Sequence, residues 1–461
     1  MYYLVTGHCP LGGEVLAGRY RLLGTQPPIV EDLHPELPVT PLGAMPAMAR
    51  PYQRLNLFRW AIPEVYTSIN LPGAEEPTVL LDRGPIDVNG FPWPTMVNAW
   101  SQADLLKQLG WLIQIVRLWD PCIQEKAAHS LLSPENIGVL GWHVRLFYLY
   151  SDAEVPPLRQ LGVAWLSQLQ PLEPALESIL QDLATDKFNS AYTLLEALEN
   201  LVIAISTTRQ PTVFGGTHPG RRKGNEDNYS FDQQQGSYGI ICDGMGGHDG
   251  GEIASAMALA SLEQDLKSLD LTQPTPTQIR QHLDQAIRRA NQLLLETNQK
   301  QGRTSYRQMG TTVVAYCLQG ALLHIAHVGD SRIYLVDQNH CQQLTVDDDV
   351  ANLEVSMART TTNMIQKMSG SGNLTQALGV ISMQMIAPSV QTVVLPEDCL
   401  ILLCSDGLCD FSFVEKYWQA DLRPLIYGDI AVGGKAIIEK ALEEMGHDNI
   451  TAILVKFTKS E

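Results

Sequence analysis

The chain has 461 residues, of which 45% are hydrophobic and 18% are charged. This composition is typical of globular proteins and excludes long disordered arms. The length predicts about two or three domains. With 32 Lys and Arg against 50 Asp and Glu, the net charge is −18, which disfavours nucleic acid or an anionic membrane surface as the main partner.

The sequence predicts neither a membrane span nor a secretion signal. The longest apolar segment, residues 105–119, is interrupted by four polar or charged residues, namely Lys107, Gln108, Gln114 and Arg117. The N-terminus lacks a basic start and a continuous apolar stretch, so a cytoplasmic location is expected. The eight cysteines include no C-x-x-C pair, which indicates buried thiols rather than a disulfide framework or a zinc ribbon.

The first 207 residues are predicted to form an N-terminal domain. Pro and Gly are frequent in the first 70 residues, which favours short strands and turns. From Ser101 onward, apolar residues recur at helical spacing in segments such as QADLLKQLGWLIQIVRLW and AYTLLEALENLVIAIS. The domain is therefore expected to be mixed and mainly helical.

Residues 208–461 have a different pattern, with Gly-rich turns and short apolar runs. Two helices are expected between residues 252 and 299. The runs TTVVAYCL, ALLHIAHVG and SRIYLVD follow one another closely. Such spacing favours antiparallel hairpins at Gln319-Gly320 and Gly329-Asp330, because parallel crossovers need a dozen or more residues. Further strands are expected at QTVVL, CLILLCS and NITAILVKF. The predicted fold class is α+β, an antiparallel β-sandwich flanked by helices.

Acidic residues lie at the ends of the apolar strands. Asp243 follows YGIIC, Asp330 follows ALLHIAHVG, and Asp406 follows CLILLCS, whereas Asp448 precedes ITAILVKF. A rigid sheet can hold such carboxylates where solvent still reaches them, as an oxygen-ligand metal site requires. A single Asp-Gly pair would be better explained as a turn, but the set as a whole favours a metal site.

These motifs strongly resemble the metal-dependent protein phosphatase family, often called protein phosphatase 2C. The similarity covers about residues 210–461. Its elements occur in the order of the family: Arg222-x-x-Asn225-Glu226-Asp227, ICDGMGGHDGGEIAS, MGTTVVA, GDSRIYLVD, LTQALG, LCSDGLCDF and HDNITAILV. The resemblance implies hydrolysis of phosphoserine and phosphothreonine by a water activated by two divalent metals, Mg²⁺ or Mn²⁺.

The resemblance also implies a role for each matching residue. Asp243 would bridge the two ions, with Glu226 and the Gly244 carbonyl on one side and Asp406 and Asp448 on the other. Asp330 would help to bind a weaker third ion, although a plain turn role is open. The remaining assignments are phosphate binding for Arg222, unless it is only a solvated loop residue, and orientation of the metal ligands for Asp227 and Asn449.

The chain departs from the family pattern at three places. Met245 stands where many members have a histidine, which leaves a metal-bound water or His248 as the proton donor, although a turn role explains His248 better. Asp347-Asp348-Asp349 replaces Asp-His-Ser, and Gln376 replaces an arginine. The last two changes lie in or beside the segment that the family uses as a flap, so they bear on substrate preference and turnover rather than on metal binding.

The N-terminal domain resembles a degenerate protein kinase. GRYRLL at residues 18–23 is similar to the entry of a kinase domain, and His129 to Asn136 aligns with the catalytic-loop pattern H-R-D-L-K-P-E-N. The catalytic Asp position then holds Leu131, and the metal-binding Asp position holds Tyr148. Phosphoryl transfer would lack its base and its metal carboxylate, which predicts a pseudokinase. An unrelated helical unit is the alternative.

Three functions remain open at this point. The favoured one is a serine/threonine phosphatase acting on phosphorylated proteins, with a cognate serine/threonine kinase as a further partner. The alternatives are a catalytically silent scaffold that binds partners and a metal-dependent hydrolase of small phosphate esters.

Overall fold

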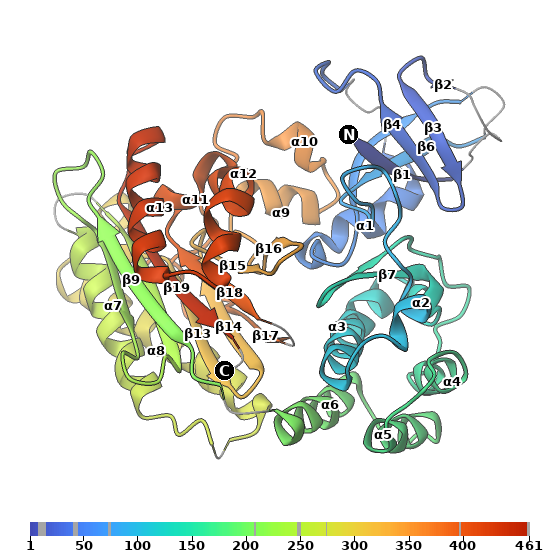
Figure 1. The fold of residues 1–461 in the computed structure, drawn as a ribbon. Coiled ribbons are helices and arrows are strands. Elements are labelled where there is room, and N and C mark those ends of the chain that lie inside the picture. Colours follow the sequence, from blue (N-terminus) through green and yellow to red (C-terminus); the bar gives the residue numbers. More distant parts are fainter. Residues whose placement is uncertain are drawn as a thin grey trace. The chain divides into compact units, whose positions relative to one another are not determined.

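The computed structural model of the chain describes residues 1–7, 15–39, 45–71, 75–206, 209–246, 250–272, 274–395 and 398–458. Its contacts divide the chain into two compact units (Figure 1). The first unit contains residues 1–201 and 350–372, and the second contains residues 202–349 and 373–461. The predicted boundary between residues 207 and 208 lies outside the described residues, and the two-domain assignment stays a prediction.

The first unit opens with an antiparallel sheet of six strands in the order β2-β3-β4-β1-β6-β5. Strand β1 lies between β4 and β6, with which it pairs, and it is buried at Tyr3, Leu4 and Val5. The strands are β1 (Tyr2–Thr6), β2 (Val15–Leu16), β3 (Tyr20–Thr25), β4 (Pro28–Asp32), β5 (Glu64–Ile69) and β6 (Thr78–Asp82).

Helices form a large part of the first unit, as the apolar spacing from Ser101 onward predicted. The long helix α3 begins after Asp104, whose carboxylate caps it by accepting from the Lys107 N–H at 2.8 Å. The helices are α1 (Arg50–Arg54), α2 (Met96–Trp100), α3 (Leu105–Gln124), α4 (Arg159–Gln168), α5 (Pro174–Ala184), α6 (Ala191–Ile205), α9 (Val350–Ser356) and α10 (Thr362–Ile365), with a hairpin of β7 (Ile137–Leu140) and β8 (His143–Leu146).

The second unit contains two antiparallel sheets. The first has the order β10-β11-β13-β14-β17, with β12 paired to β11, and the second has the order β16-β15-β18-β19-β9. The strands are β9 (Thr212–His218), β10 (Asp227–Phe231), β11 (Tyr238–Met245), β12 (Gly310–Thr311), β13 (Val313–Gln319), β14 (Leu322–Val328), β15 (Arg332–Val336), β16 (Cys341–Gln343), β17 (Ser389–Val394), β18 (Cys399–Cys404) and β19 (Ile450–Phe457).

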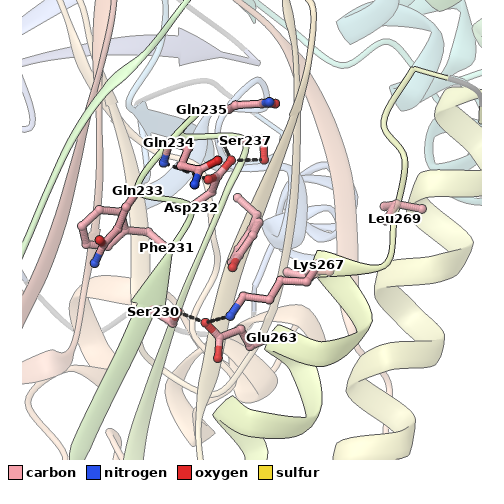
Figure 2. Close-up of a pocket in the computed structure, with 12 residues that line it drawn as sticks. Ser230, Phe231, Asp232, Gln233, Gln234, Gln235, Ser237, Glu263, Lys267 and Leu269 are labelled. Atoms are coloured by element: carbon pink, nitrogen blue, oxygen red, sulfur yellow. Dashed lines mark hydrogen bonds and ion pairs between the residues drawn. The ribbon is translucent and has the colours of Figure 1, made fainter.

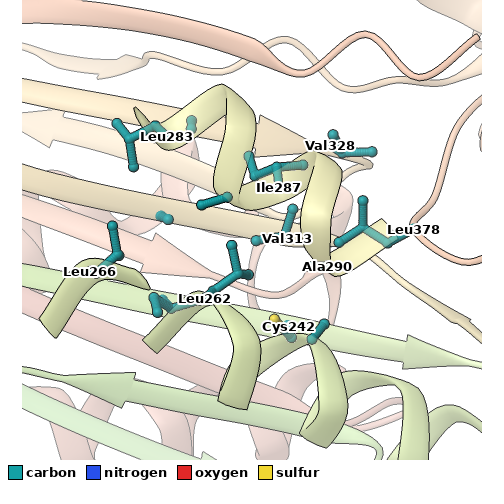
Figure 3. Close-up of a cluster of buried hydrophobic side chains, with 14 of the residues drawn as sticks. Cys242, Leu262, Leu266, Leu283, Ile287, Ala290, Val313, Val328 and Leu378 are labelled. Atoms are coloured by element: carbon teal, nitrogen blue, oxygen red, sulfur yellow. The ribbon is translucent and has the colours of Figure 1, made fainter. Parts of the chain in front are cut away.

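Helices cover both sheets of this unit, which confirms the predicted fold class (Figure 1). Helices α7 (Gly250–Lys267) and α8 (Pro276–Lys300) pack on the first sheet, and α13 (Ile430–Glu444) packs on the second. The short helices α11 (Asp406–Cys409) and α12 (Phe413–Tyr417) follow β18. Figure 3 shows the core under α7 and α8, where Leu262 and Leu283 face the strand residues Cys242 and Val313. Four buried residues of α7, at 254, 258, 262 and 266, recur every fourth position and form the apolar face that this packing needs.

One of the two predicted hairpins is confirmed and the other needs correction. The turn at Gln319-Gly320 does join the antiparallel pair β13 and β14, but Gly329-Asp330 is not a hairpin. Strand β15 pairs with β16 and β18 of the other sheet, so the chain crosses between the sheets at Asp330. Gly329 has a φ of +106°, a conformation that glycine adopts at little cost and that permits this change of direction.

The cysteines and the absence of a predicted membrane span are the two remaining features. Of the described cysteines, which exclude Cys9, all are free and all except the half-buried Cys341 are buried, as expected. Within the described ranges, no helix is long and apolar enough to cross a membrane.

The close backbone approach at Gly407, where α11 passes the start of β19, can be tested by substitution. A Cβ atom there would lie 2.0 Å from the main-chain oxygen of Asn449, and neither backbone can yield without moving the acids beside it. We expect Gly407→Ala to lower the free energy of unfolding by about 1–3 kcal/mol, measured by chemical denaturation. At Gly224 an added Cβ meets nothing within 4 Å, so Gly224→Ala is the control, and equal losses in both variants would contradict this packing.

Candidate metal centre

Two aspartates face each other across the first sheet. In the antiparallel pair of β10 and β11, Asp227 stands directly opposite Asp243, so their side chains lie on the same face about 5 Å apart at Cβ. Like charges at such a position destabilise a sheet. Strand β11 runs on past Asp243 to Met245, further than predicted, because Gly244 and Met245 pair with β12.

Strand register brings the other acids to the same end of the unit. Cys404, at the end of β18, pairs with Arg332 of β15 and with Ala452 of β19. Asp330 and Asp406 therefore flank one strand junction, and Asp448 lies just before β19. The sequence had predicted this placement at strand ends, and the register explains why residues so far apart in the chain meet.

The carboxyl groups lie close together and repel one another. The Asp243 carboxyl lies within hydrogen-bonding reach of the Asp227 and Asp406 carboxyls. Burial, followed by repulsion from four other aspartates, holds the pKa of Asp243 well above its ordinary value. Burial and neighbouring aspartates also raise the pKa of Asp406 to about 7 and that of Asp330 to about 8. Asp243, Asp330 and Asp406 still keep partial contact with solvent.

The donors fit divalent cations. In the described part of the chain, no three His, Cys, Asp or Glu side chains are already arranged to hold an ion. However, Asp227 Oδ1 is buried without a hydrogen-bond donor, and ionised carboxylates can only accept. Oxygen atoms crowded together in this way require either protons or a cation between them, and carboxylate oxygens are the ligands that Mg²⁺ and Mn²⁺ prefer.

Glu226 is separated from Asp227 although the two are adjacent in sequence. A Cβ added at Gly251 would lie 2.6 Å from the Glu226 carboxyl carbon, and one added at Gly244 would lie 2.2 Å from the Gly251 carbonyl oxygen. Only glycines allow the chain to approach this closely. The Ser255 hydroxyl of α7 donates to the Glu226 carbonyl. Glu226 therefore faces the N-terminus of α7.

Asp227 instead ties β10 to the second sheet. Its Oδ2 accepts from the Ser405 hydroxyl at 2.8 Å and from the Thr451 hydroxyl at 2.6 Å. The side chain is thus fixed beside Asp406 and the start of β19. The predicted role of Asp227 in orienting the metal ligands stays a prediction.

Asn449 holds the loop that carries Glu226. Its Oδ1 accepts from the Glu226 N–H at 2.8 Å, and its Nδ2 donates to the carbonyls of Pro219 and Gly224 at 2.9 and 3.0 Å. The side chain is 5% exposed. One buried amide thereby joins the 219–226 loop to the start of β19.

Arg222 lies beside Asp448. Its Nη2 donates to Asp448 Oδ2 at 2.5 Å, and its Nε donates to the His447 carbonyl at 3.2 Å. The guanidinium is 56% exposed, so further N–H donors of its planar fork are available to a bound anion.

Four supporting residues were given no role from sequence. Besides Ser405 and Thr451, Thr311 donates through its hydroxyl to the Asp243 carbonyl at 2.8 Å, and the Thr312 N–H donates to the same carbonyl. One indication of these residues was present in the sequence, because they stand directly beside motif residues in MGTT, CSDG and DNIT. Hydroxyl side chains at such places can hydrogen-bond neighbouring backbone and carboxylates, but spacing alone does not say which.

The departures from the family pattern have structural roles here. Asp348 Oδ2 accepts from the Gly329 N–H at 2.9 Å, and Asp347 pairs with Arg332 at 2.7 Å. Gln376 exchanges two hydrogen bonds with the backbone of Ala387. The proposed proton donor His248 lies outside the described residues. None of these changes removes a candidate ligand.

Of the cavities in the second unit, one lies away from the acids and another lies beside them. A polar cavity of about 510 Å³ is lined by residues 230–238 and the end of α7 (Figure 2), with Ser230, Glu263 and Lys267 joined by hydrogen bonding. It lies at the end of β10 away from Asp227, so it is separate from the acids. A second cavity of about 380 Å³ is lined by Phe411, Tyr417, His447 and neighbouring residues, directly beside Asp448.

Residues 129–136, which were compared with a kinase catalytic loop from sequence, form a hydrogen-bonded turn in the first unit. Asn136 is buried, its Nδ2 donates to the carbonyls of Ser130 and Tyr148, and its Oδ1 accepts from the Tyr148 N–H. His129 contacts Asp152 at 3.0 Å. These contacts hold two short 3₁₀ turns, Ala128–Leu131 and Pro134–Asn136, against the β7–β8 hairpin.

Comparison with known proteins gives matches to one family. The sequence model described as protein phosphatase 2C matches residues 214–445. Protein phosphatase PhpP of Streptococcus pneumoniae serotype 2 is 30% identical over 224 residues, covering 48% of this chain and 86% of that protein. The serine/threonine phosphatase stp of Listeria welshimeri is 31% identical over 242 residues, covering 51% and 91%. The solved structure of Mycobacterium tuberculosis PstP/Ppp covers 54% of this chain and 99% of its own, with 26% identity and a TM-score of 0.47.

The chain therefore belongs to the protein phosphatase 2C family, as its motifs predicted. The family match begins at residue 214 and leaves the preceding residues uncovered. A kinase-like arrangement of the N-terminal region stays a prediction.

The crowded acids predict how stability depends on pH when no metal is present. Asp330 and Asp406, with pKa values raised to about 8 and 7 from 3.8, bind protons more tightly in the folded chain than in the unfolded chain. Their stabilising contribution is complete below about pH 4 and is lost as the pH rises toward 8. We expect the melting temperature of the metal-free protein to fall between pH 5 and 8, and the fall to be smaller in Asp330→Asn. A melting temperature that rises over this range in chelator would contradict the described cluster.

Proposed function

We propose that this protein is a serine/threonine protein phosphatase that hydrolyses phosphoserine and phosphothreonine with the help of divalent metals. The observation that carries this proposal is the crowding of Asp227, Asp243 and Asp406, together with Asp330 and Asp448, at one end of the β-sandwich. Their carboxylates repel one another unless cations neutralise them. Membership of the protein phosphatase 2C family provides the reaction that such a centre serves.

The residues divide into two ligand groups around Asp243. Glu226 and the Gly244 carbonyl would hold one ion, and Asp406 and Asp448 would hold the other, with Asp243 shared between them. Asp330 would contribute to a weaker third site with Asp406. Either Mg²⁺ or Mn²⁺ suits this all-oxygen donor set.

When bound, the divalent ions supply an activated water as the nucleophile near neutral pH and neutralise charge that develops on the phosphoryl oxygens. The chain's own part is to position and to bind. Asn449 and Asp227 fix the loops and strands that carry the ligands. Arg222 presents its exposed guanidinium beside Asp448, where it can take phosphoryl oxygens in the planar geometry that arginine provides.

The substrates proposed are phosphorylated proteins in the cytoplasm, and the further partner is a cognate serine/threonine kinase. In the first unit, we propose a kinase-like segment without phosphoryl-transfer activity, because Leu131 and Tyr148 occupy the positions of the two required aspartates. The buried contacts of Asn136 support a structural role for this segment.

The scaffold alternative rests on Asp348 and Gln376, since changes near the site could accompany loss of activity. Both side chains make defined hydrogen bonds to backbone, and all candidate ligands are present, which favours the enzyme. A hydrolase of small phosphate esters would use the same centre and differs only in substrate.

Removal of one shared carboxylate tests the proposal. We expect Asp243→Asn to lower Mn²⁺-dependent hydrolysis of a phosphothreonine peptide by at least about 10²-fold, because charge neutralisation at the phosphoryl group is lost. The same variant should have a higher melting temperature in chelator, since one repelling charge is gone, which shows that it is folded.

The control is Glu439→Gln, an exposed acid on α13, which should keep wild-type activity. Parallel assays with p-nitrophenyl phosphate separate the alternatives. Activity on the small ester alone would favour the small-ester hydrolase, and no activity of the wild type on either substrate would favour the scaffold. Full activity of Asp243→Asn would refute the proposed centre.

A further inference from the structure

A short segment of the second half of the sequence belongs to the first compact unit. Residues 350–372, with helices α9 and α10, group with residues 1–201 in the first unit, whereas the residues before and after them group with the second unit. The family match runs through this segment. A piece of the phosphatase sequence is therefore held by the N-terminal half.

Buried hydrogen bonds hold the segment in place. Gln53 Nε2 donates to the Thr360 carbonyl at 2.6 Å, and the Thr362 hydroxyl donates to Glu64 Oε2 at 2.7 Å. Gln53 and Glu64 are 2% and 7% exposed. Asn56 adds a bond to Asn352 at 3.2 Å.

The contact is polar and incompletely satisfied. Gln53 Oε1, Asn56 Oδ1 and Thr361 Oγ1 are buried without hydrogen-bond partners, around a cavity of about 10 Å³, the space of about one water. Buried polar groups that lack partners cost free energy. Such a contact costs less free energy to open than a well-packed apolar core.

Both ends of segment 350–372 continue into the second unit, and the residues that flank it connect it to the metal centre. We call these flanking residues the stem: residues 348–349 before the segment and residues 374–378 after it. Asp349 pairs with Leu374 in an isolated bridge, and the Thr375 N–H donates to the Asp348 carbonyl at 2.7 Å. Asp348 in turn exchanges two hydrogen bonds with Gly329, the neighbour of Asp330.

Residues 374–378 of the stem are connected to Asp243 as well. Leu378 and Thr311 bond through their backbones in both directions, and the Thr311 hydroxyl donates to the Asp243 carbonyl at 2.8 Å. A continuous series of covalent and hydrogen bonds therefore runs from segment 350–372 to the backbones of Asp330 and Asp243.

We propose that Gln53 and Glu64 are positioning residues of the phosphatase, which hold segment 350–372 and thereby fix the stem that supports Asp330 and Asp243. The N-terminal half then controls the metal centre through its hold on this segment. The inference builds on the proposed function, but its structural part can be tested without activity.

The test compares backbone hydrogen exchange in the full-length wild type and in Gln53→Met/Thr362→Val, which removes both donors. We expect exchange of segment 350–372 to rise by about tenfold, the effect of losing one or two hydrogen bonds. The amides of Thr375 in the stem and of Gly329 beside it should exchange faster too, while those of β18 and β19 stay unchanged. The Mn²⁺ concentration for half-maximal hydrolysis should rise several-fold.

Two further variants separate positioning from simple stability. Thr362→Ser keeps the hydroxyl and should restore the wild-type values. Arg359→Gln removes an ion pair to Glu354 that is internal to the segment and should leave the stem unchanged. If fast exchange in β1 and β6 shows that the double variant has unfolded, Thr362→Val alone is the test.

The outcomes are distinct. Faster exchange confined to segment 350–372, or no change anywhere, would overturn the positioning role. An inactive wild type would refute the proposed function and leave the exchange result to decide the inference.

Discussion

The main constraint on the structure is electrostatic repulsion between aspartate carboxylates, which the register of the β-sheets brings close together. Pairing of β10 with β11 places Asp227 opposite Asp243, and the junction of β15, β18 and β19 adds Asp330, Asp406 and Asp448 to the same end of the sandwich. The surrounding apolar core fixes the strands, so the acids cannot move apart. Cations that neutralise this cluster would bind without a large rearrangement of the sheets.

A supporting layer of neutral polar groups gives the cluster its geometry. Asn449, Ser405, Thr451 and the hydroxyl of Thr311 hydrogen-bond the ligand-bearing loops and strands. They carry no charge, so they do not add to the repulsion. Close backbone approach at Gly251 and Gly407 completes the arrangement, because any larger residue would separate the segments. The site is thus built on strands and tight turns, which hold ligands more rigidly than long loops do.

Much of the phosphatase unit could be predicted from sequence because its signals are local. Alternating and continuous apolar runs indicated β13, β14, β17, β18 and β19, and the acids at their ends indicated the site. Predictions failed where distant contacts decide. Close spacing suggested a hairpin at Gly329-Asp330, but the chain crosses to the other sheet there because β15 pairs with β18. Nor could local pattern show that residues 350–372 pack with residues 1–201, since Gln53 and Thr360 are 307 positions apart.

The proposed centre depends on Asp243 being shared between two divalent ions. Anomalous diffraction at the manganese edge, from crystals of the full chain grown with Mn²⁺, would locate the ions. We expect two peaks that both lie within bonding distance of the Asp243 carboxylate, one also beside Glu226 and the other beside Asp406. A single peak, or peaks that do not contact Asp243, would contradict it.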